Sequence, residues 1–327
     1  AENMTLYAKW QSYHSITYIT TNNEVTDIST GMVNIEKYID FDISNNAVIA
    51  LTEDYQVIVW GQSRYGFLGV EGTNTYISQP INITSNFDLQ EDEYIIKISL
   101  GYGNGIALTS SHRIFTWGAN FNGSLGDGTL VNSVYPIDIT QNLNIDSNDK
   151  VVEIYSGNYF SIVLTQSGRV FSWGINGSGQ LGNGTNLDSS LPVEITHLFS
   201  LDNDEIITEI FMRQTSIHAI TSLGKVFAWG TNYNGSLGID SSVSSINSPQ
   251  EITDNFALLD NEIVTSISAY DSHSLATTSL GRVFGWGYQH ALFLTESYNY
   301  TYSPVDITNF FEFTNGEIPI EAGNISF

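Results

Sequence analysis

Residues 170–182 of the chain read VFSWGINGSGQLG, and this stretch decides the fold because it is one of five similar copies. Each copy starts as an apolar strand and reaches a Trp-Gly pair, and four of the five end in a Leu-Gly turn. The copies recur about every 56 residues and span Val57–Gly69, Ile114–Gly126, Val170–Gly182, Val226–Gly238 and Val283–Thr295. A fixed period of this length predicts a repeat architecture.

A second landmark keeps the same period. It is a Pro-x-x-Ile-Thr segment that opens at Pro80, Pro136, Pro192, Pro249 and Pro304. A proline that opens the last strand of a unit predicts that this strand lies at an outer edge of the sheet, where a missing N–H costs nothing.

Each unit is expected to form four short strands. In the second unit these are residues 94–99, 106–109, 113–117 and 137–140. In the third strand Phe115 and Trp117 point to one face and Ile114 to the other, so both faces of the sheet are apolar. Such a sheet must lie between similar sheets. The pattern therefore favours an all-β fold, a β-propeller of four-stranded blades, over a linear solenoid with shorter repeats.

The best copy, residues 157–184, resembles the repeat of the regulator of chromosome condensation family, which runs G-x-x-H-S-x-A-L-T-x-x-G-x-V-x-x-W-G-x-N-x-x-G-Q-L-G. The resemblance covers about residues 32–327, and it implies a propeller that has seven blades in the family. The chain holds about five full repeats and part of a sixth near 317–327. We therefore expect residues 29–327 to form an incomplete ring, either as part of a longer polypeptide or with blades missing, in preference to a closed ring of five blades.

The first residues of the chain follow a different pattern. Residues 3–10, NMTLYAKW, resemble the closing strand of the Listeria–Bacteroides (internalin B-type) repeat, a small bacterial surface module. The resemblance implies a bacterial surface or secreted protein, with residues 1–28 as the end of a preceding module and a linker.

The absence of cysteine fits the cytosol as well as a bacterial exterior, so it does not locate the protein. No apolar run approaches the ~18 residues of a membrane span.

The charge of the chain limits its partners. Ten Lys and Arg stand against 35 Asp and Glu, which gives a formal net charge of −25. This balance opposes binding to nucleic acid or anionic lipid, so the chromatin contacts of the family's nuclear members are not expected here. It favours a protein partner with a basic patch.

Four of the ten basic residues occupy one repeat slot, four residues before the tryptophan. They are Arg113, Arg169, Lys225 and Arg282, and an acid follows each later proline by two residues, at Asp138, Glu194, Glu251 and Asp306. The first unit has Gln56 and Asn82 in these slots, so we predict a cross-strand ion pair in blades two to five. The alternative is a ring of basic groups that holds an anionic ligand.

Acidic clusters before each first strand, such as 202–205, are interpreted as solvated turns rather than calcium loops.

No pattern for chemistry stands out in the sequence. It lacks a G-x-S-x-G elbow, an H-E-x-x-H helix and a phosphate loop, and its six histidines have no ligand spacing. We therefore expect no enzymatic activity, cofactor or metal.

Binding residues are expected at the loop tips, which differ from repeat to repeat. Three residues after each Trp-Gly pair stand Arg64, Phe121, Gly177, Tyr233 and His290, of which Gly177 offers no side chain. Tyr298, Tyr300 and Tyr302 alternate, so an extended segment would present all three on one face, either for binding or for packing at a blade edge.

These observations favour a non-catalytic protein-binding scaffold or adhesin on a bacterial surface or secreted protein. Divergent tips on a rigid scaffold are suited to recognition, and Tyr, Phe and Arg suit binding hot spots. Two alternatives remain open. One is a carbohydrate-binding adhesin that uses the exposed tyrosines, and the other is guanine nucleotide exchange on a small GTPase, an activity known in the family.

Overall fold

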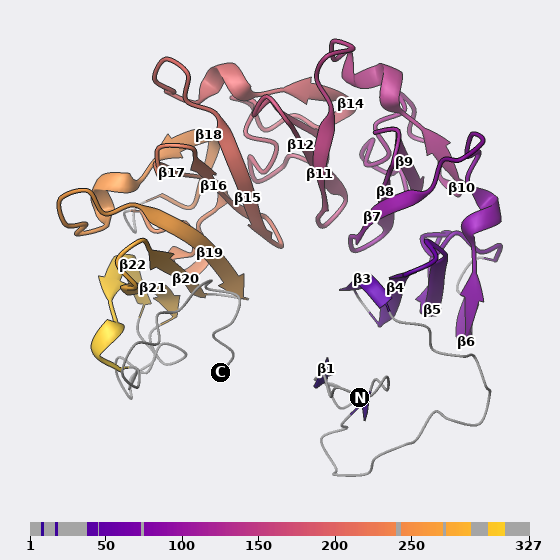
Figure 1. Cartoon of the computed structure of the whole chain (residues 1–327), viewed down its shortest axis with the longest axis horizontal. Helices are drawn as coiled ribbons and strands as arrows, with labels where there is room; N and C mark the ends of the chain where they lie inside the picture. The colour runs from indigo at the N-terminus through magenta and orange to yellow at the C-terminus, as the bar shows by residue number, and fades with distance from the viewer. Residues whose placement is uncertain are drawn as a thin grey trace.

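The computed structural model describes residues 8–9, 17–18, 38–44, 46–72, 75–239, 243–270, 273–288 and 300–310. These residues form five four-stranded antiparallel sheets and a two-stranded ribbon of β1 (Ala8–Lys9) and β2 (Thr17–Tyr18). The sheets surround a central axis as blades, and the described ring is open between the first and the fifth (Figure 1). The predicted all-β propeller with an incomplete ring is confirmed.

The blades follow the sequence repeat. They are β3 (Tyr38–Ser44), β4 (Ala47–Thr52), β5 (Val57–Ser63), β6 (Thr75–Asn82); β7 (Ile95–Leu100), β8 (Asn104–Thr109), β9 (Ile114–Gly118), β10 (Ser133–Asp138); β11 (Val151–Ser156), β12 (Phe160–Thr165), β13 (Val170–Gly174), β14 (Ser189–Glu194); β15 (Ile207–Arg213), β16 (Ser216–Thr221), β17 (Val226–Thr231), β18 (Ser245–Glu251); and β19 (Val264–Tyr270), β20 (His273–Thr278), β21 (Val283–Tyr288), β22 (Tyr300–Asp306). The first strand of each blade faces the axis and the fourth forms the outer wall (Figure 1).

Helical structure in the described residues is limited to single 3-10 turns. They are η1 (Thr84–Asn86), η2 (Thr140–Leu143), η3 (Thr196–Leu198), η4 (Tyr233–Gly235), η5 (Thr253–Asn255) and η6 (Thr308–Phe310). None of the helices in these ranges has the length and apolar character that a membrane crossing requires.

The fourth strand lies at the outer edge as predicted, but its predicted bounds in the second blade are wrong. It runs from Ser133 to Asp138 rather than over 137–140. Pro136 lies inside it, where the register shifts between Ser133 and Ile137 and the proline needs no ladder partner. The prediction failed because a proline was taken to start the strand.

The Ile-Thr pair after each proline closes the blade instead of extending the strand. In the second blade Ile139 N–H donates to the carbonyl of Ile114 at 2.9 Å, and Thr140 Oγ1 accepts a hydrogen bond from Ile114 N–H at 2.9 Å. The other blades repeat the threonine bond, with Thr84, Thr196, Thr253 and Thr308 accepting from Val57, Val170, Val226 and Val283. The pair therefore fixes the outer wall to the third strand, which explains its periodicity.

The two halves of the Trp-Gly and Leu-Gly signature meet at the interface between blades. Trp173 is fully buried, and its indole N–H donates to the carbonyl of Ser124 in the preceding blade at 3.0 Å. Gly126, at φ 70°, leaves room for the indole ring of Trp173, because a Cβ on Gly126 would lie 2.7 Å from Trp173 Nε1. Trp117, Trp229 and Trp286 make the same bond to the blade before them. The apolar core consequently lies between the blades.

Trp173→Phe is expected to lower the free energy of unfolding by about 1–3 kcal/mol, because the Ser124 carbonyl stays buried without its donor. Trp60→Phe is the matched control: Trp60 is only half-buried and has no preceding blade in the described chain, so we expect a loss within ~0.5 kcal/mol. Urea unfolding of both variants measures the difference. Equal losses would show that the inter-blade hydrogen bond contributes nothing.

Candidate functional site

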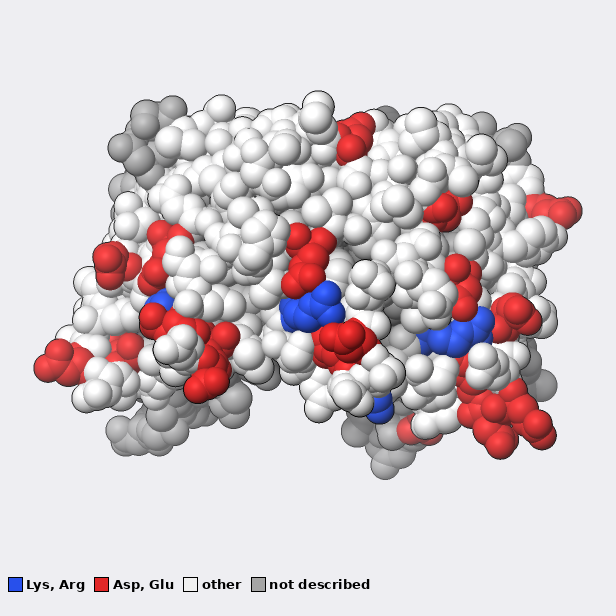
Figure 2. Space-filling model, turned by 90° about the horizontal axis from the view of Figure 1, so that it is seen from above, with Lys and Arg blue, Asp and Glu red and all other residues white. Residues whose placement is uncertain are grey.

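The antiparallel blades place different loops at the two ends of the ring. One end, the charged rim, carries the loops from second to third strands (53–56, 110–113, 166–169, 222–225, 279–282) and from fourth to next first strands (83–94, 139–150, 195–206, 252–263). The other end, the aromatic rim, carries the loops from first to second strands and from third to fourth strands. The outer wall in Figure 2 shows cations and most carboxylates gathered in one half.

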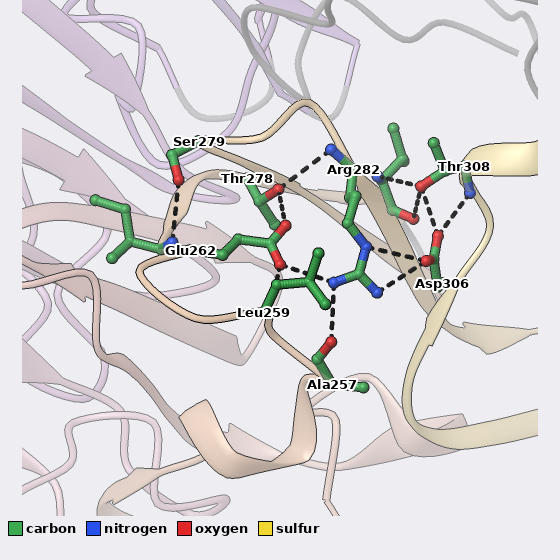
Figure 3. A network of polar contacts seen from close by, with 10 residues as sticks. Ala257, Leu259, Glu262, Thr278, Ser279, Arg282, Asp306 and Thr308 are labelled. Atoms are coloured by element: carbon green, nitrogen blue, oxygen red, sulfur yellow. Dashed lines mark hydrogen bonds and ion pairs between the residues drawn. The ribbon is translucent and has the colours of Figure 1, made fainter.

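The charged rim is built from triads in which one cation bridges two carboxylates. In the fifth blade Arg282 Nη1 lies 2.7 Å from Glu262 Oε2 and its Nη2 lies 2.8 Å from Asp306 Oδ2 (Figure 3). Nη1 also donates to the carbonyl of Ala257 at 2.8 Å, and the guanidinium stacks 4.7 Å from the centre of the Phe284 ring. The cation is therefore saturated by groups of its own blade and of the loop before it.

The predicted cross-strand ion pair is confirmed in three blades. The nitrogen–oxygen distances are 2.8 Å for Arg113–Asp138, 2.7 Å for Arg169–Glu194 and 2.8 Å for Arg282–Asp306.

The prediction is wrong for Lys225, which pairs with Asp202 at 2.9 Å and Glu205 at 3.0 Å instead of with Glu251. The planar fork of a guanidinium can reach the acid of the fourth strand as well as the buried carboxylate, whereas the compact ammonium of Lys225 binds the two carboxylates of the preceding loop. The first blade holds a neutral equivalent, since Asn82 Nδ2 donates to Gln56 Oε1 at 2.8 Å.

The interpretation of the acidic clusters as solvated turns is wrong for their last residue. The side chains of Glu205 and Glu262 are 0% exposed and that of Glu93 is 2% exposed. Each precedes its cation by 20 residues, and this constant spacing is the signal that the sequence reasoning missed. Burial works against ionisation of Glu93, but hydrogen bonds from Gln90, Ser111, Thr109 and Arg113 lower its pKa to about 2.

The alternative of an anion-binding basic ring does not fit this rim, because carboxylates already occupy its cations. Among the residues with described placement, no group of three or more His, Cys, Asp or Glu side chains could hold a metal ion.

The aromatic rim carries a continuous row of rings, which we call the aromatic strip: Tyr65, Phe121, Tyr159 and Tyr102. Tyr65 meets Phe121 edge to face with centroids 4.9 Å apart. Phe121 lies 6.2 Å from Tyr159, and Tyr159 lies 5.6 Å from Tyr102. Tyr65, Phe121 and Tyr102 are 46%, 48% and 42% exposed. The strip thus presents an apolar and partly hydroxylated surface across three blades.

Close backbone packing holds the strip in place. Gly66 rests on the second blade, where an added Cβ would lie 2.6 Å from Val134 Cγ2. Gly103 lies under the Tyr159 ring, where an added Cβ would lie 2.4 Å from the ring's Cε1. Tyr65 and Tyr159 adopt positive φ values of 55° and 61°. Such a conformation costs a residue other than glycine about 1–3 kcal/mol and persists only where the surroundings enforce it. The rings are therefore displayed in a fixed arrangement.

The asparagine of the Trp-Gly-x-Asn signature fixes the loop that carries Phe121. Asn120 is fully buried, its Oδ1 accepts from Leu125 N–H at 3.0 Å, and its Nδ2 donates to the carbonyl of Val131 at 3.2 Å. In the next blade Asn176 makes the same two kinds of bond, at 2.9 Å and 3.0 Å. A buried amide inside each loop makes these tips part of the rigid scaffold.

The structure brings two of the predicted binding residues together. Arg64 directly precedes Tyr65, and Phe121 lies in the middle of the strip. Tyr233 is 70% exposed on η4 of the fourth blade, Tyr300 is 37% exposed on β22, and Tyr302 packs against Gly235. His290 and Tyr298 lie outside the described residues.

Sequence reasoning missed Tyr65, Tyr102 and Tyr159. Tyr102 and Tyr159 lie in loops between first and second strands, whereas the search for binding residues was confined to the tips after Trp-Gly. The topology of the blade could have revealed them. In a four-stranded antiparallel blade, the loop from the first to the second strand and the loop from the third to the fourth strand lie at the same end.

Five four-stranded blades with these inter-blade bonds define a repeat β-propeller. The chain belongs to the RCC1-like domain family, whose model matches residues 17–324. It is 32% identical to the ultraviolet-B receptor UVR8 of Arabidopsis thaliana over 194 residues, 59% of this chain and 41% of the relative. It is 32% identical to the probable E3 ubiquitin-protein ligase HERC4 of Rattus norvegicus over 259 residues, 78% of this chain and 23% of the relative.

Solved structures share the fold. Human WBSCR16 superposes with a TM-score of 0.72 at 19% identity, covering 93% of this chain and 76% of that one. Prp20p of Saccharomyces cerevisiae, whose binding to Gsp1p and histones has been characterised, gives a TM-score of 0.67 at 22% identity, covering 83% and 65%. The chain spans less than half the length of UVR8 and HERC4, so the matches define the domain and its fold.

Proposed function

We propose that this domain is a non-catalytic protein-binding scaffold and that its partner docks on the aromatic strip. The observation that carries the proposal is the row of rings at Tyr65, Phe121, Tyr159 and Tyr102, of which all but the half-buried Tyr159 are exposed. Aromatic side chains supply large contact areas with few rotatable bonds, and they are enriched among binding hot spots. Rigid loops lower the ordering cost of binding.

Phe121→Ala is expected to weaken retention of the partner at least tenfold, because it removes the central ring of the strip. The immobilised chain is offered cell-surface and secreted proteins at ~0.05 and ~0.15 M salt, and retained proteins are compared between variants. Tyr76→Ala is the matched control, because Tyr76 is 73% exposed on β6 and outside the strip. A partner that is retained equally by both variants would place the binding surface elsewhere.

Two rival functions make different predictions. A carbohydrate-binding adhesin would use Tyr233 and Tyr300, and its binding would be insensitive to salt and competed by glycans. Guanine nucleotide exchange draws support from the fold shared with Prp20p, which binds Gsp1p. Accelerated nucleotide release from a small GTPase would favour this function over a passive scaffold.

We further propose that the domain works on the outside of a bacterial cell. The support is the stretch NMTLYAKW at residues 3–10, which resembles part of a bacterial surface module. An antibody against the propeller should label intact cells of the source organism without permeabilisation. Labelling that requires permeabilised cells would overturn this localisation.

A further inference from the structure

Arg64 differs from most cations of the described residues because none of the described carboxylates forms an ion pair with it. With 35 acidic and ten basic residues in the chain, most described cations have acidic neighbours. The four rim cations lie in triads or pairs, and Lys97 pairs with Glu153. In the described part of the chain the exposed Arg64 forms no ion pair, and neither does Lys150 at the opposite rim.

The described carboxylates at the aromatic rim bind other groups. Glu71 accepts a hydrogen bond from the Tyr135 hydroxyl at 2.8 Å. Asp127 accepts from Asn120 Nδ2 at 3.0 Å, and Asp188 accepts from Asn176 N–H at 2.7 Å. The described acidic groups at this rim therefore hold loops together, and the guanidinium of Arg64 remains available to a ligand.

Arg64 lies next to the aromatic strip. It directly precedes Tyr65, whose ring meets Phe121. Burial raises the pKa of the Tyr159 hydroxyl, Tyr102 and Tyr65 raise it further, and the positive charge of Arg64 opposes them. The geometric link is the chain itself, because Arg64 and Tyr65 are neighbours in the loop between β5 and β6. One cation thus borders a row of apolar rings.

We propose that Arg64 and the aromatic strip together recognise an extended peptide in which a carboxylate lies close to a large apolar or aromatic side chain. The apolar side chain packs on Phe121 and its neighbours, and the carboxylate takes the charge-assisted hydrogen bonds of the free guanidinium. This inference rests on the proposed protein-binding function and adds the chemistry of the partner. It departs from the basic partner that the net charge favours, because the acidic groups are concentrated at the other rim.

Selection from a displayed library of short random peptides tests the proposal. The full chain is immobilised as wild type, Arg64→Glu, Phe121→Ala and Lys150→Glu, and the retained peptides are sequenced. Wild type should enrich Asp or Glu within a few residues of an aromatic or large aliphatic residue. Arg64→Glu should lose the acidic preference and weaken the best peptide at least tenfold, while the apolar preference stays. Lys150→Glu, the same charge change at the opposite rim, should select as wild type does.

The outcomes separate this inference from the proposed function. Peptides that lose affinity in Phe121→Ala but carry no acidic preference would overturn the role of Arg64 and leave the scaffold function standing. An acidic preference that survives Arg64→Glu would also overturn it. A wild-type chain that enriches no peptide, while a glycan array gives binding that Phe121→Ala abolishes, would overturn both.

Discussion

Arg282→Met is expected to lower the free energy of unfolding by about 3–5 kcal/mol. The reason is that Glu262, whose side chain is 0% exposed, would keep its charge in the interior after losing its cation. The substitution also frees Asp306 and the Ala257 carbonyl, which are more exposed and contribute less. Urea unfolding at neutral pH, followed by tryptophan fluorescence, measures the change.

The first blade provides the matched control for this prediction. Gln56→Met removes the neutral hydrogen bond to Asn82 at the equivalent slot, and we expect a loss of about 1 kcal/mol or less. Adding Glu262→Gln to Arg282→Met should recover much of the loss, because the unpaired buried charge is then gone. Arg282→Met and Gln56→Met with equal effects would mean that the triad contributes no more than the neutral hydrogen bond of the first blade.

Acid is expected to destabilise the fold through His218, which lies on β16 between the fourth and fifth blades. Its side chain is 0% exposed, and its ring packs edge to face on Trp286 with centroids 5.6 Å apart. Burial lowers the pKa of His218 from 6.5 to about 4, and a backbone contact to Leu237 offsets only part of this. The unfolded chain therefore takes up the proton first as the pH falls.

The sign and size of this effect follow from linkage between protonation and folding. Above pH 6.5 His218 is neutral in both the folded and the unfolded state, so it adds no pH dependence. Between pH 6.5 and about 4, protonation of His218 in the unfolded state lowers the free energy of unfolding by about 3 kcal/mol. Measuring wild type against His218→Leu at several pH values isolates this effect, because the carboxylates are common to both proteins. The difference should grow in favour of Leu below pH 6.5. A difference that is constant with pH would show that His218 does not titrate with an acid-shifted pKa.

The repeated sequence was sufficient to predict the blade. Strand alternation, Trp-Gly and Pro-x-x-Ile-Thr are local patterns, and each has a local or nearest-neighbour cause, such as the bond from Ile114 N–H to Thr140 Oγ1. The cross-strand ion pairs were predictable for the same reason, since Arg113 directly precedes β9 and Asp138 ends the neighbouring strand β10. The buried partner Glu93 was missed because residues 90–93 have the composition of a solvated turn. Only packing in the folded protein excludes water from the Glu93 side chain.

The sequence by itself determined the architecture of this protein, because a 56-residue period repeats the same strands, caps and inter-blade bonds. Only the tertiary structure decided where the charges and aromatic rings gather. Tyr65, Phe121, Tyr159 and Tyr102 come from four loops in three blades, and no local pattern relates them. Blade stacking brings them to one rim and sends most carboxylates to the other. The net charge of −25 therefore describes the whole chain but not the surface that we propose for binding.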